Sequence, residues 1–320
     1  MYLCKRYSII GMLNIVFIVI GIVLVLWGAD RMTDGAVALA QRMNIPQIVI
    51  GLTVVAIGTS APELFISLVS ALKSTPDLAV GNVVGSNIFN TMLIVGSAAL
   101  ISPMLIAPST VKKDIPFTVI ASVMLALMCL DNNISRIDAL LLFAMFIVFM
   151  IYTVRLGKRG GSEVENENEK DYSVFKSICF VALGLACLIG GSNLFVEGAK
   201  HIAAALGVSD AVIGLTIVAG GTSLPELATS VVAARKGRSA LAIGNVIGSN
   251  VFNILMILGI TGIICPMQLA GITRVDISML MVSILLVWLF SFTRYKLERW
   301  EGILLLIMFF GYMGWLIYNV

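Results

Sequence analysis

Charged side chains are scarce in this sequence. Asp, Glu, Lys and Arg make up only 12% of the 320 residues, and 59% of the residues are hydrophobic. Soluble domains carry roughly 25% charged residues, so the composition excludes a chain of soluble domains. Several apolar runs reach about 20 residues, the length that crosses a bilayer. The lysines and arginines lie between these runs and form no patch, which gives no indication of nucleic-acid binding.

Histidine and paired cysteines are also nearly missing. The sequence has a single histidine, His201, and five cysteines without a CxxC pair or other metal-like spacing. A zinc site or a Ser-His-Asp triad would therefore depend on one residue. We predict that the protein is not an enzyme and needs no cofactor. We interpret the cysteines as small buried hydrophobic residues; they are Cys4, Cys129, Cys179, Cys187 and Cys265.

The hydropathy pattern predicts an all-α polytopic membrane protein with ten transmembrane helices. One hydrophilic linker, residues 155–174, separates a first half at 1–154 from a second half at 175–320. Each half contains five of the predicted spans. In chain order the spans cover 13–40, 47–72, 78–101, 115–130, 136–154, 175–205, 210–234, 241–264, 273–293 and 300–318.

The distribution of lysine and arginine predicts the orientation in the membrane, because cytoplasmic loops carry an excess of these residues. Both termini are expected outside and the linker in the cytoplasm. Lys5 and Arg6 oppose this weakly, unless the chain starts at Met12. The compact chain without a large regulatory loop favours a prokaryotic plasma membrane. The expected partners are the lipid bilayer and ions, with no obligate protein partner.

An internal repeat is the most specific signal in the sequence. Val49–Gly96 aligns with Val212–Gly259 without a gap, and 29 of the 48 aligned positions are identical. We call this alignment, which places Val49 on Val212, the repeat register. It extends back to Asp34, which aligns with Glu197. An odd number of spans in each half inserts the second copy upside down, so the sequence predicts two inverted five-helix repeats, a transporter architecture with its site near the midplane.

Each repeat places one glutamate, Glu63 or Glu226, among apolar residues directly after a proline. An ionised carboxylate inside a membrane costs several kcal/mol unless it has a partner or a function. Neither motif contains a cation, and the nearest in the first, Lys73, is about three helical turns away. Two glutamates meeting at the centre would repel each other, and a bound cation is the obvious missing charge.

The neighbours of both glutamates supply further oxygen atoms. Pro62 and Pro225 lack a backbone N–H, so we expect them to break the helix and free carbonyls around residues 56, 59, 219 and 222. In the second part of each motif, hydroxyl and amide oxygens lie four residues apart, a spacing that places them on one face of a helix. An oxygen-only site suits Ca²⁺ or Na⁺ and fits soft transition metals poorly. Four further asparagines are either ion ligands or hydrogen-bond partners of the helix breaks: Asn82, Asn87, Asn245 and Asn250.

These motifs resemble the two alpha-repeats of the cation/calcium exchanger superfamily, in particular its sodium/calcium exchanger branch. The matching stretches are GTSAPE with GNVVGSNIFN and GGTSLPE with GNVIGSNVFN. The resemblance implies an antiporter that binds Ca²⁺ at Glu63 and Glu226 with help from Thr59 and Thr222. It implies sodium sites that share these four residues and add Ala56, Ser60, Ser86, Asn90, Ala219, Ser223, Ser249 and Asn253.

Three positions bear on the coupling ion. Proton/calcium relatives typically carry Glu where this chain has Gly85 and Gly248, which favours sodium. Potassium-dependent relatives have Asp where this chain has Asn253, which argues against a potassium requirement. The sequence therefore predicts Na⁺/Ca²⁺ exchange, with a proton-coupled calcium exchanger as the alternative. Gly81 with Gly85 and Gly244 with Gly248 also form small-xxx-small pairs that permit close helix packing.

Overall fold

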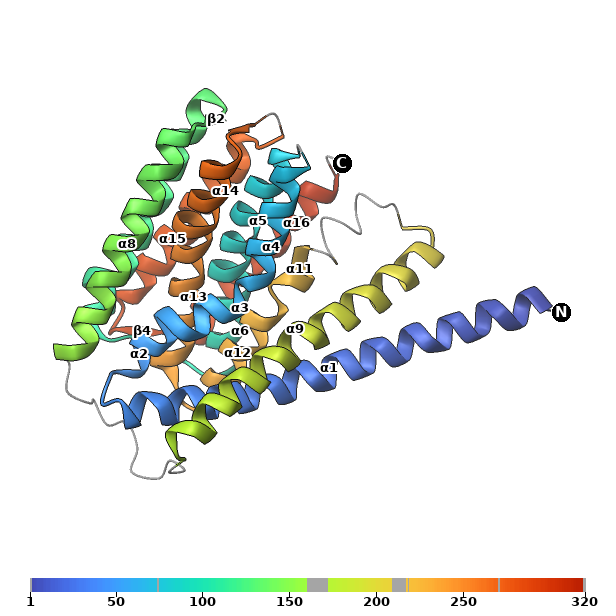
Figure 1. Ribbon diagram of the computed structural model, residues 1–320, viewed down its shortest axis with the longest axis horizontal. Helices are drawn as coiled ribbons and strands as arrows, with labels where there is room; N and C mark the ends of the chain where they lie inside the picture. Colours follow the sequence, from blue (N-terminus) through green and yellow to red (C-terminus); the bar gives the residue numbers. More distant parts are fainter. Residues whose placement is uncertain are drawn as a thin grey trace.

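The computed structural model describes residues 2–73, 75–159, 172–208, 217, 219–269 and 271–318, and it is almost entirely helical (Figure 1). Two long helices, α1 (Tyr2–Arg42) and α9 (Val174–Ala205), run diagonally beside a bundle formed by the other helices. The helices of the first half are α2 (Gln47–Ile50), η1 (Gly51–Val55), α3 (Ala56–Thr59), α4 (Ala61–Leu72), α5 (Pro76–Ile88), η2 (Phe89–Ile94), α6 (Val95–Ile101), η3 (Thr110–Asp114), α7 (Ile115–Met128), η4 (Cys129–Asp131) and α8 (Arg136–Arg159).

The second half contains a corresponding set of elements. Its helices are α11 (Ala219–Thr222), α12 (Leu224–Arg235), α13 (Ser239–Val251), η6 (Phe252–Ile257), α14 (Leu258–Ile264), α15 (Arg274–Ser291) and α16 (Arg299–Tyr318). Four two-residue strands join the loops: β1 (Met104–Leu105), β2 (Asn133–Ile134), β3 (Met267–Gln268) and β4 (Lys296–Leu297). Elements η1, η2, η3 and η6 are π-helical segments, and such segments frequently occur at functional sites.

The predicted spans agree with the helices in most places. Among the described residues, eight helices are long and apolar enough to cross a membrane, or nine when Gln47–Thr59 and Ala61–Leu72 are counted as one bent span. The predicted span 210–234 lies partly outside the described residues. Helix α1 begins at Tyr2, well before the predicted residue 13, because residues 2–12 contain no proline that would end it. The ten-span count stays a prediction.

The interpretation of the cysteines as buried was wrong. Cys179 is exposed on the helix surface, and Cys129, Cys187 and Cys265 are only partly buried. The surface of a bundle that faces lipid is apolar, so a small apolar side chain such as cysteine can lie there at little cost. The side chain of Cys4 lies outside the described part of the chain.

Contacts between the two halves follow the repeat register. Strand β1 pairs with β4, and its counterpart β3 pairs with β2. Phe89 packs edge-on against Phe309 with ring centroids 5.3 Å apart, and Phe252 packs against Phe146 at 5.0 Å. Phe252 is the counterpart of Phe89, and Phe309 is the counterpart of Phe146, so the second contact repeats the first with the halves exchanged. The halves therefore contact each other through equivalent pairs.

Helices α1 and α9 approach each other through glycines. A Cβ atom on Gly28 would lie 2.7 Å from the carbonyl oxygen of Gly184, and one on Gly184 would lie 2.7 Å from that of Gly28. Backbones this close leave no space for a side chain. The two long helices therefore form one tightly packed pair. At the end where α1 stops and α9 begins, Arg42 Nε donates to the carbonyl of Tyr172 at 3.1 Å, and we call this end the linker side.

Candidate ion-binding site

Both glutamates lie directly after a break in a helix. Helix α3 ends at Thr59 and α4 begins at Ala61, and the two segments meet at 47°. The residue between them, Ser60, has φ −82° and ψ 7°, outside the helical region, and its counterpart Ser223 has φ −89° and ψ 7°. Pro62 and Pro225 occupy the first turn of α4 and α12, where a missing N–H is tolerated. Each break thus puts a glutamate in the first turn of a new helix.

The breaks free fewer carbonyls than the sequence suggested. Ser60 N still donates to the carbonyl of Ala56 at 3.0 Å, and Leu64 N donates to that of Ser60 at 3.2 Å. Ser60 belongs to neither α3 nor α4, so the regular helical bond from Glu63 N to the carbonyl of Thr59 is interrupted. The carbonyl of Ala56 is therefore not freed by the break, contrary to expectation, whereas that of Thr59 is.

The two carboxylates are held by each other's motifs. Ser223 Oγ donates to Glu63 Oε1 at 3.2 Å, and Ser60 Oγ donates to Glu226 Oε1 at 3.1 Å. The side chain of Thr222 also lies within hydrogen-bonding range of the Glu63 carboxylate, and that of Thr59 within range of the Glu226 carboxylate. Both glutamates are only 1% exposed. The breaks of the two halves therefore face each other and bring both carboxylates to one place.

No lysine or arginine of the described residues forms an ion pair with either glutamate. The second oxygens, Glu63 Oε2 and Glu226 Oε2, are buried and accept no hydrogen bond from any described residue. An uncompensated buried carboxylate is strongly unfavourable. The arrangement thus has a deficit of positive charge at its centre, which a bound cation would satisfy.

Three neutral oxygens extend this set. Asn90 Oδ1, Asn253 Oδ1 and Ser249 Oγ are likewise buried without a hydrogen-bond partner in the described part of the chain. Asn90 lies on η2, which packs against α12, and Asn253 lies on η6, which packs against α4. The described residues contain no group of three or more His, Cys, Asp or Glu side chains that could hold a metal ion. Any ion would therefore be held by two carboxylates with hydroxyl, amide and carbonyl oxygens, a hard ligand set that suits Ca²⁺ and Na⁺.

Two of the four additional asparagines support the helix breaks. Asn82 Nδ2 donates to the carbonyl of Glu63 at 3.2 Å and to Ser67 Oγ at 3.0 Å. Asn245 Nδ2 does the same with the carbonyl of Glu226 at 3.3 Å and Ser230 Oγ at 2.9 Å. Of the two roles considered for them, hydrogen bonding to the breaks is confirmed. Sequence reasoning missed Ser67 and Ser230, although the repeat register relates them.

The other two asparagines differ from each other. Asn250 Oδ1 accepts a hydrogen bond from Asn90 Nδ2 at 3.1 Å, so it positions a candidate ligand. Asn87 is fully buried, and neither atom of its amide has a partner among the described residues. Ser86, on α5, is 5% exposed. Ala56 and Ala219 begin the short helices α3 and α11, immediately before the breaks.

Comparison with known proteins identifies the family. A model of the family described as "Sodium/calcium exchanger protein" matches residues 13–155 and 176–318, and the chain belongs to this family. It is 39% identical to a putative antiporter, CaxA, from Alkalimonas amylolytica over 93% of this chain and 96% of that protein. It is 33% identical to the sodium/calcium exchanger MaX1 from Methanosarcina acetivorans over 95% and 99% of the two chains.

Solved structures agree with this assignment. A structure of the sodium-calcium exchanger NCX_Mj soaked without Na⁺ and Ca²⁺ matches with a TM-score of 0.84 and 34% identity, and covers 95% of this chain and 99% of that one. CaxA, MaX1 and NCX_Mj are named as an antiporter or as exchangers. Together with the long apolar helices, they identify this chain as an integral multi-pass membrane protein of a cation/calcium antiporter family.

Proposed function

We propose that the protein is a secondary-active antiporter that exchanges Na⁺ for Ca²⁺ at the site between Glu63 and Glu226. The observation that carries this proposal is the pair of buried carboxylates, facing each other from the two halves without a lysine or arginine partner among the described residues. Two carboxylates neutralise one Ca²⁺, or several Na⁺ spread over adjacent oxygens. An empty site would leave two like charges close together. Holding one kind of ion or the other is therefore favoured over holding none, which is the requirement for exchange.

The proposed ligands include the unpartnered oxygens. Ca²⁺ is proposed to bind Glu63 and Glu226 with oxygens of Thr59 and Thr222. Na⁺ is proposed to use these residues with Ala56, Ser60, Ser86, Asn90, Ala219, Ser223, Ser249 and Asn253. The unpartnered oxygens of Asn90, Asn253 and Ser249 support this set. The names of relatives support the ions, since MaX1 is called a sodium/calcium exchanger and NCX_Mj was soaked with Na⁺, Ca²⁺ and Sr²⁺.

The transport mechanism that we infer is alternating access between two inverted repeats, 1–154 and 175–320, joined by the linker 155–174. The equivalent contacts in the repeat register support two related halves. Sites at the interface of such halves are opened in turn to each side. The charge distribution favours both termini outside and the linker in the cytoplasm.

Radioactive calcium uptake into proteoliposomes tests the coupling ion. The vesicles are loaded with Na⁺, K⁺ or choline, each with and without an imposed pH gradient. We expect uptake only with internal Na⁺. Uptake driven by the pH gradient with choline inside would establish the proton-coupled alternative instead. Calcium conductance without any counter-ion would indicate a channel.

Asn253 provides a test of the proposed sodium site. Asn253→Asp replaces the amide that carries an unpartnered oxygen by a carboxylate, so we expect the Na⁺ concentration for half-maximal uptake to fall by about tenfold, the equivalent of roughly 1.4 kcal/mol. We also expect K⁺ to support some uptake. The matched control is Asn132→Asp, which adds the same charge at an exposed position in the turn between α7 and α8. No change in either ion dependence would remove position 253 from the ion site.

A further inference from the structure

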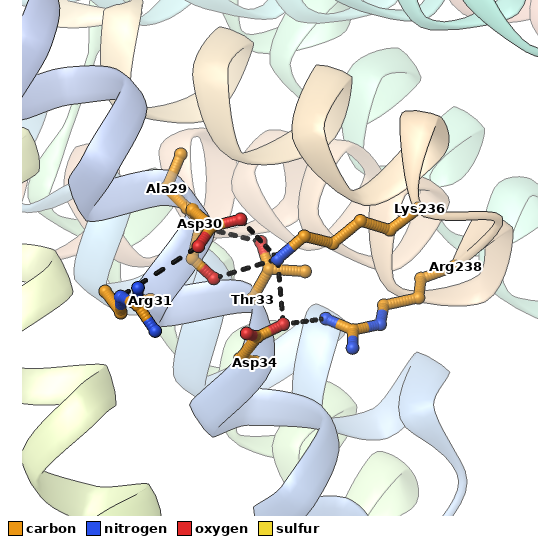
Figure 2. A network of polar contacts seen from close by, with 7 residues as sticks. All are labelled: Ala29, Asp30, Arg31, Thr33, Asp34, Lys236 and Arg238. Atoms are coloured by element: carbon orange, nitrogen blue, oxygen red, sulfur yellow. Dashed lines mark hydrogen bonds and ion pairs between the residues drawn. The ribbon is translucent and has the colours of Figure 1, made fainter. Parts of the chain in front are cut away.

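An ion-pair cluster joins α1 to the end of α12 on the linker side (Figure 2). Lys236 Nζ lies 2.6 Å from Asp30 Oδ1 and 2.8 Å from Asp34 Oδ1, and it also donates to the carbonyl of Asp30 at 3.2 Å. Arg238 contacts Asp34 Oδ1 at 2.8 Å. The side chains of Asp34 and Arg238 are only 10% and 15% exposed. We call these four residues the linker-side cluster.

The counterpart of this cluster is not formed. In the repeat register Asp34 corresponds to Glu197, and Lys236 corresponds to Lys73. Both charges are therefore present at the opposite end of the molecule, where α9 and α4 stop. Yet Glu197 is 53% exposed and contacts His201 on its own helix at 2.9 Å, and no ion pair joins it to Lys73 within the described residues. Lys73 itself is exposed.

Helix packing differs in the same way as the ion pairs: it is tight on the linker side and loose at the opposite end. Helix α1 packs along α12, and Ala29, Met32, Thr33 and Ala36 are fully buried. Helix α9 has no comparable packing against α4 in the described part of the chain, and Figure 1 shows the end of α9 diverging from α4. The counterparts of Met32 and Thr33, Phe195 and Val196, are only partly buried.

Many other contacts between the halves occur twice, although the hydrogen bond from Asn90 to Asn250 has no counterpart between Asn253 and Asn87. The strand pairs, the aromatic pairs, the Ser–Glu hydrogen bonds and the Asn82 and Asn245 bonds all have their counterparts. Two halves of related sequence are able to exchange conformations. A contact that only one half makes in this conformation is then expected to form in the other half once the two have exchanged conformations.

We propose that the linker-side cluster is a latch that holds the linker side closed, and that an ion pair between Glu197 and Lys73 replaces it when the opposite side closes. The pair α1–α9 would move as one body, because its glycine contacts leave no room for a side chain between the helices. The proposal rests on the alternating access of the proposed function. Lys73 has no second cation corresponding to Arg238, since Thr75 stands at that position. The linker-side latch is therefore the stronger of the two.

Hydrogen exchange of the full-length protein in lipid nanodiscs, with Na⁺ and without Ca²⁺, tests the latch. We expect Asp34→Asn to shift the ratio of the two states by about fivefold. Backbone exchange then rises around residues 30–42 and 230–238 and falls around residues 66–73 and 197–208. Glu197→Gln is expected to shift exchange in the opposite direction, and the double variant to lie between the two.

Two results would overturn the latch. One is a rise on the linker side with no fall at the opposite end, since this indicates local loosening only. The other is a change in the same direction for Asp34→Asn and Glu197→Gln. The matched control is Glu298→Gln, which removes the surface ion pair with Lys296 at 3.0 Å and should change exchange only near β4. Calcium uptake is measured on the same wild-type preparation. Reciprocal shifts in exchange without sodium-driven uptake would support the latch and refute the proposed function. Sodium-driven uptake without reciprocal shifts would support the proposed function and refute the latch.

Discussion

Glu63→Gln and Glu226→Gln are each expected to abolish sodium-driven calcium uptake, with a loss of about 100-fold or more. Removing one member of a buried charge pair typically costs about 3–5 kcal/mol, and each substitution removes one of the two charges proposed to balance Ca²⁺. Glutamine keeps the size of the side chain and still accepts the hydrogen bond from Ser223 or Ser60. The fold should therefore persist, which size-exclusion chromatography and thermal unfolding in detergent can check.

Glu298→Gln serves as the matched control for both variants, because Glu298 is a partly exposed glutamate on the loop before α16. It should retain near-normal uptake. Substantial uptake by Glu63→Gln or Glu226→Gln, at wild-type protein levels, would contradict the proposed role of the carboxylate pair. Loss of the folded protein in a variant would be separated from loss of transport by the thermal measurement.

The sequence predicted which residues form the site better than how they contact each other. Hydropathy located most of the helices, because crossing a bilayer requires long apolar segments. The proline after each Thr-Ser pair located the helix breaks at Ser60 and Ser223. The crossed bonds from Ser60 to Glu226 and from Ser223 to Glu63 could not be predicted, since they join residues 160 or more positions apart.

The repeat register relates the charges of the linker-side cluster to those at the opposite end, but it does not tell which ion pair is formed. It aligns Asp34 with Glu197, and it equally aligns Lys236 with Lys73. Whether the ion pair forms on one side or the other depends on the conformation, which no local pattern encodes. The same limit applies to the π-helical segments η2 and η6, which carry the candidate ligands Asn90 and Asn253. These segments pack against the opposite half, η2 against α12 and η6 against α4.

The two glycine pairs illustrate the limit most clearly, because related positions have different surroundings. A Cβ atom on Gly248 would lie 2.7 Å from the Cβ of Ala56 and 2.8 Å from the Cα of Leu52. A Cβ atom on Gly85, the counterpart in the first half, would meet no atom of the described residues within 4 Å. Close packing was therefore predicted correctly for Gly244 and Gly248, whereas for Gly81 and Gly85 it stays a prediction, because most counterparts of the η1 residues lie outside the described part of the chain. The tight surroundings of Gly248 follow from α13 lying against η1 and α3.

Gly248→Ala is accordingly expected to reduce calcium uptake at least about tenfold, with Gly85→Ala as the comparison, because its Cβ atom would meet no described atom within 4 Å in this conformation. The extra methyl group must push η1 and α3 away from α13, and overpacking of this kind typically costs about 1–3 kcal/mol. Helix α3 carries Ala56 and Thr59 into the site, so the displacement would misplace proposed ligands of both ions. Thermal unfolding should also show a lower midpoint for Gly248→Ala than for Gly85→Ala.

The same pair of positions bears on the coupling ion. A Cβ atom on Gly248 meets close neighbours, whereas one on Gly85 would meet no described atom within 4 Å. The glutamate that the resemblance places here in proton/calcium relatives would therefore require a different packing of α13, which supports the sodium coupling proposed above. Wild-type uptake by Gly248→Ala would mean that α13 and α3 separate without cost. The close packing at Gly248 would then be no argument against a proton-coupled mechanism, and the prediction for Gly248→Ala would be wrong.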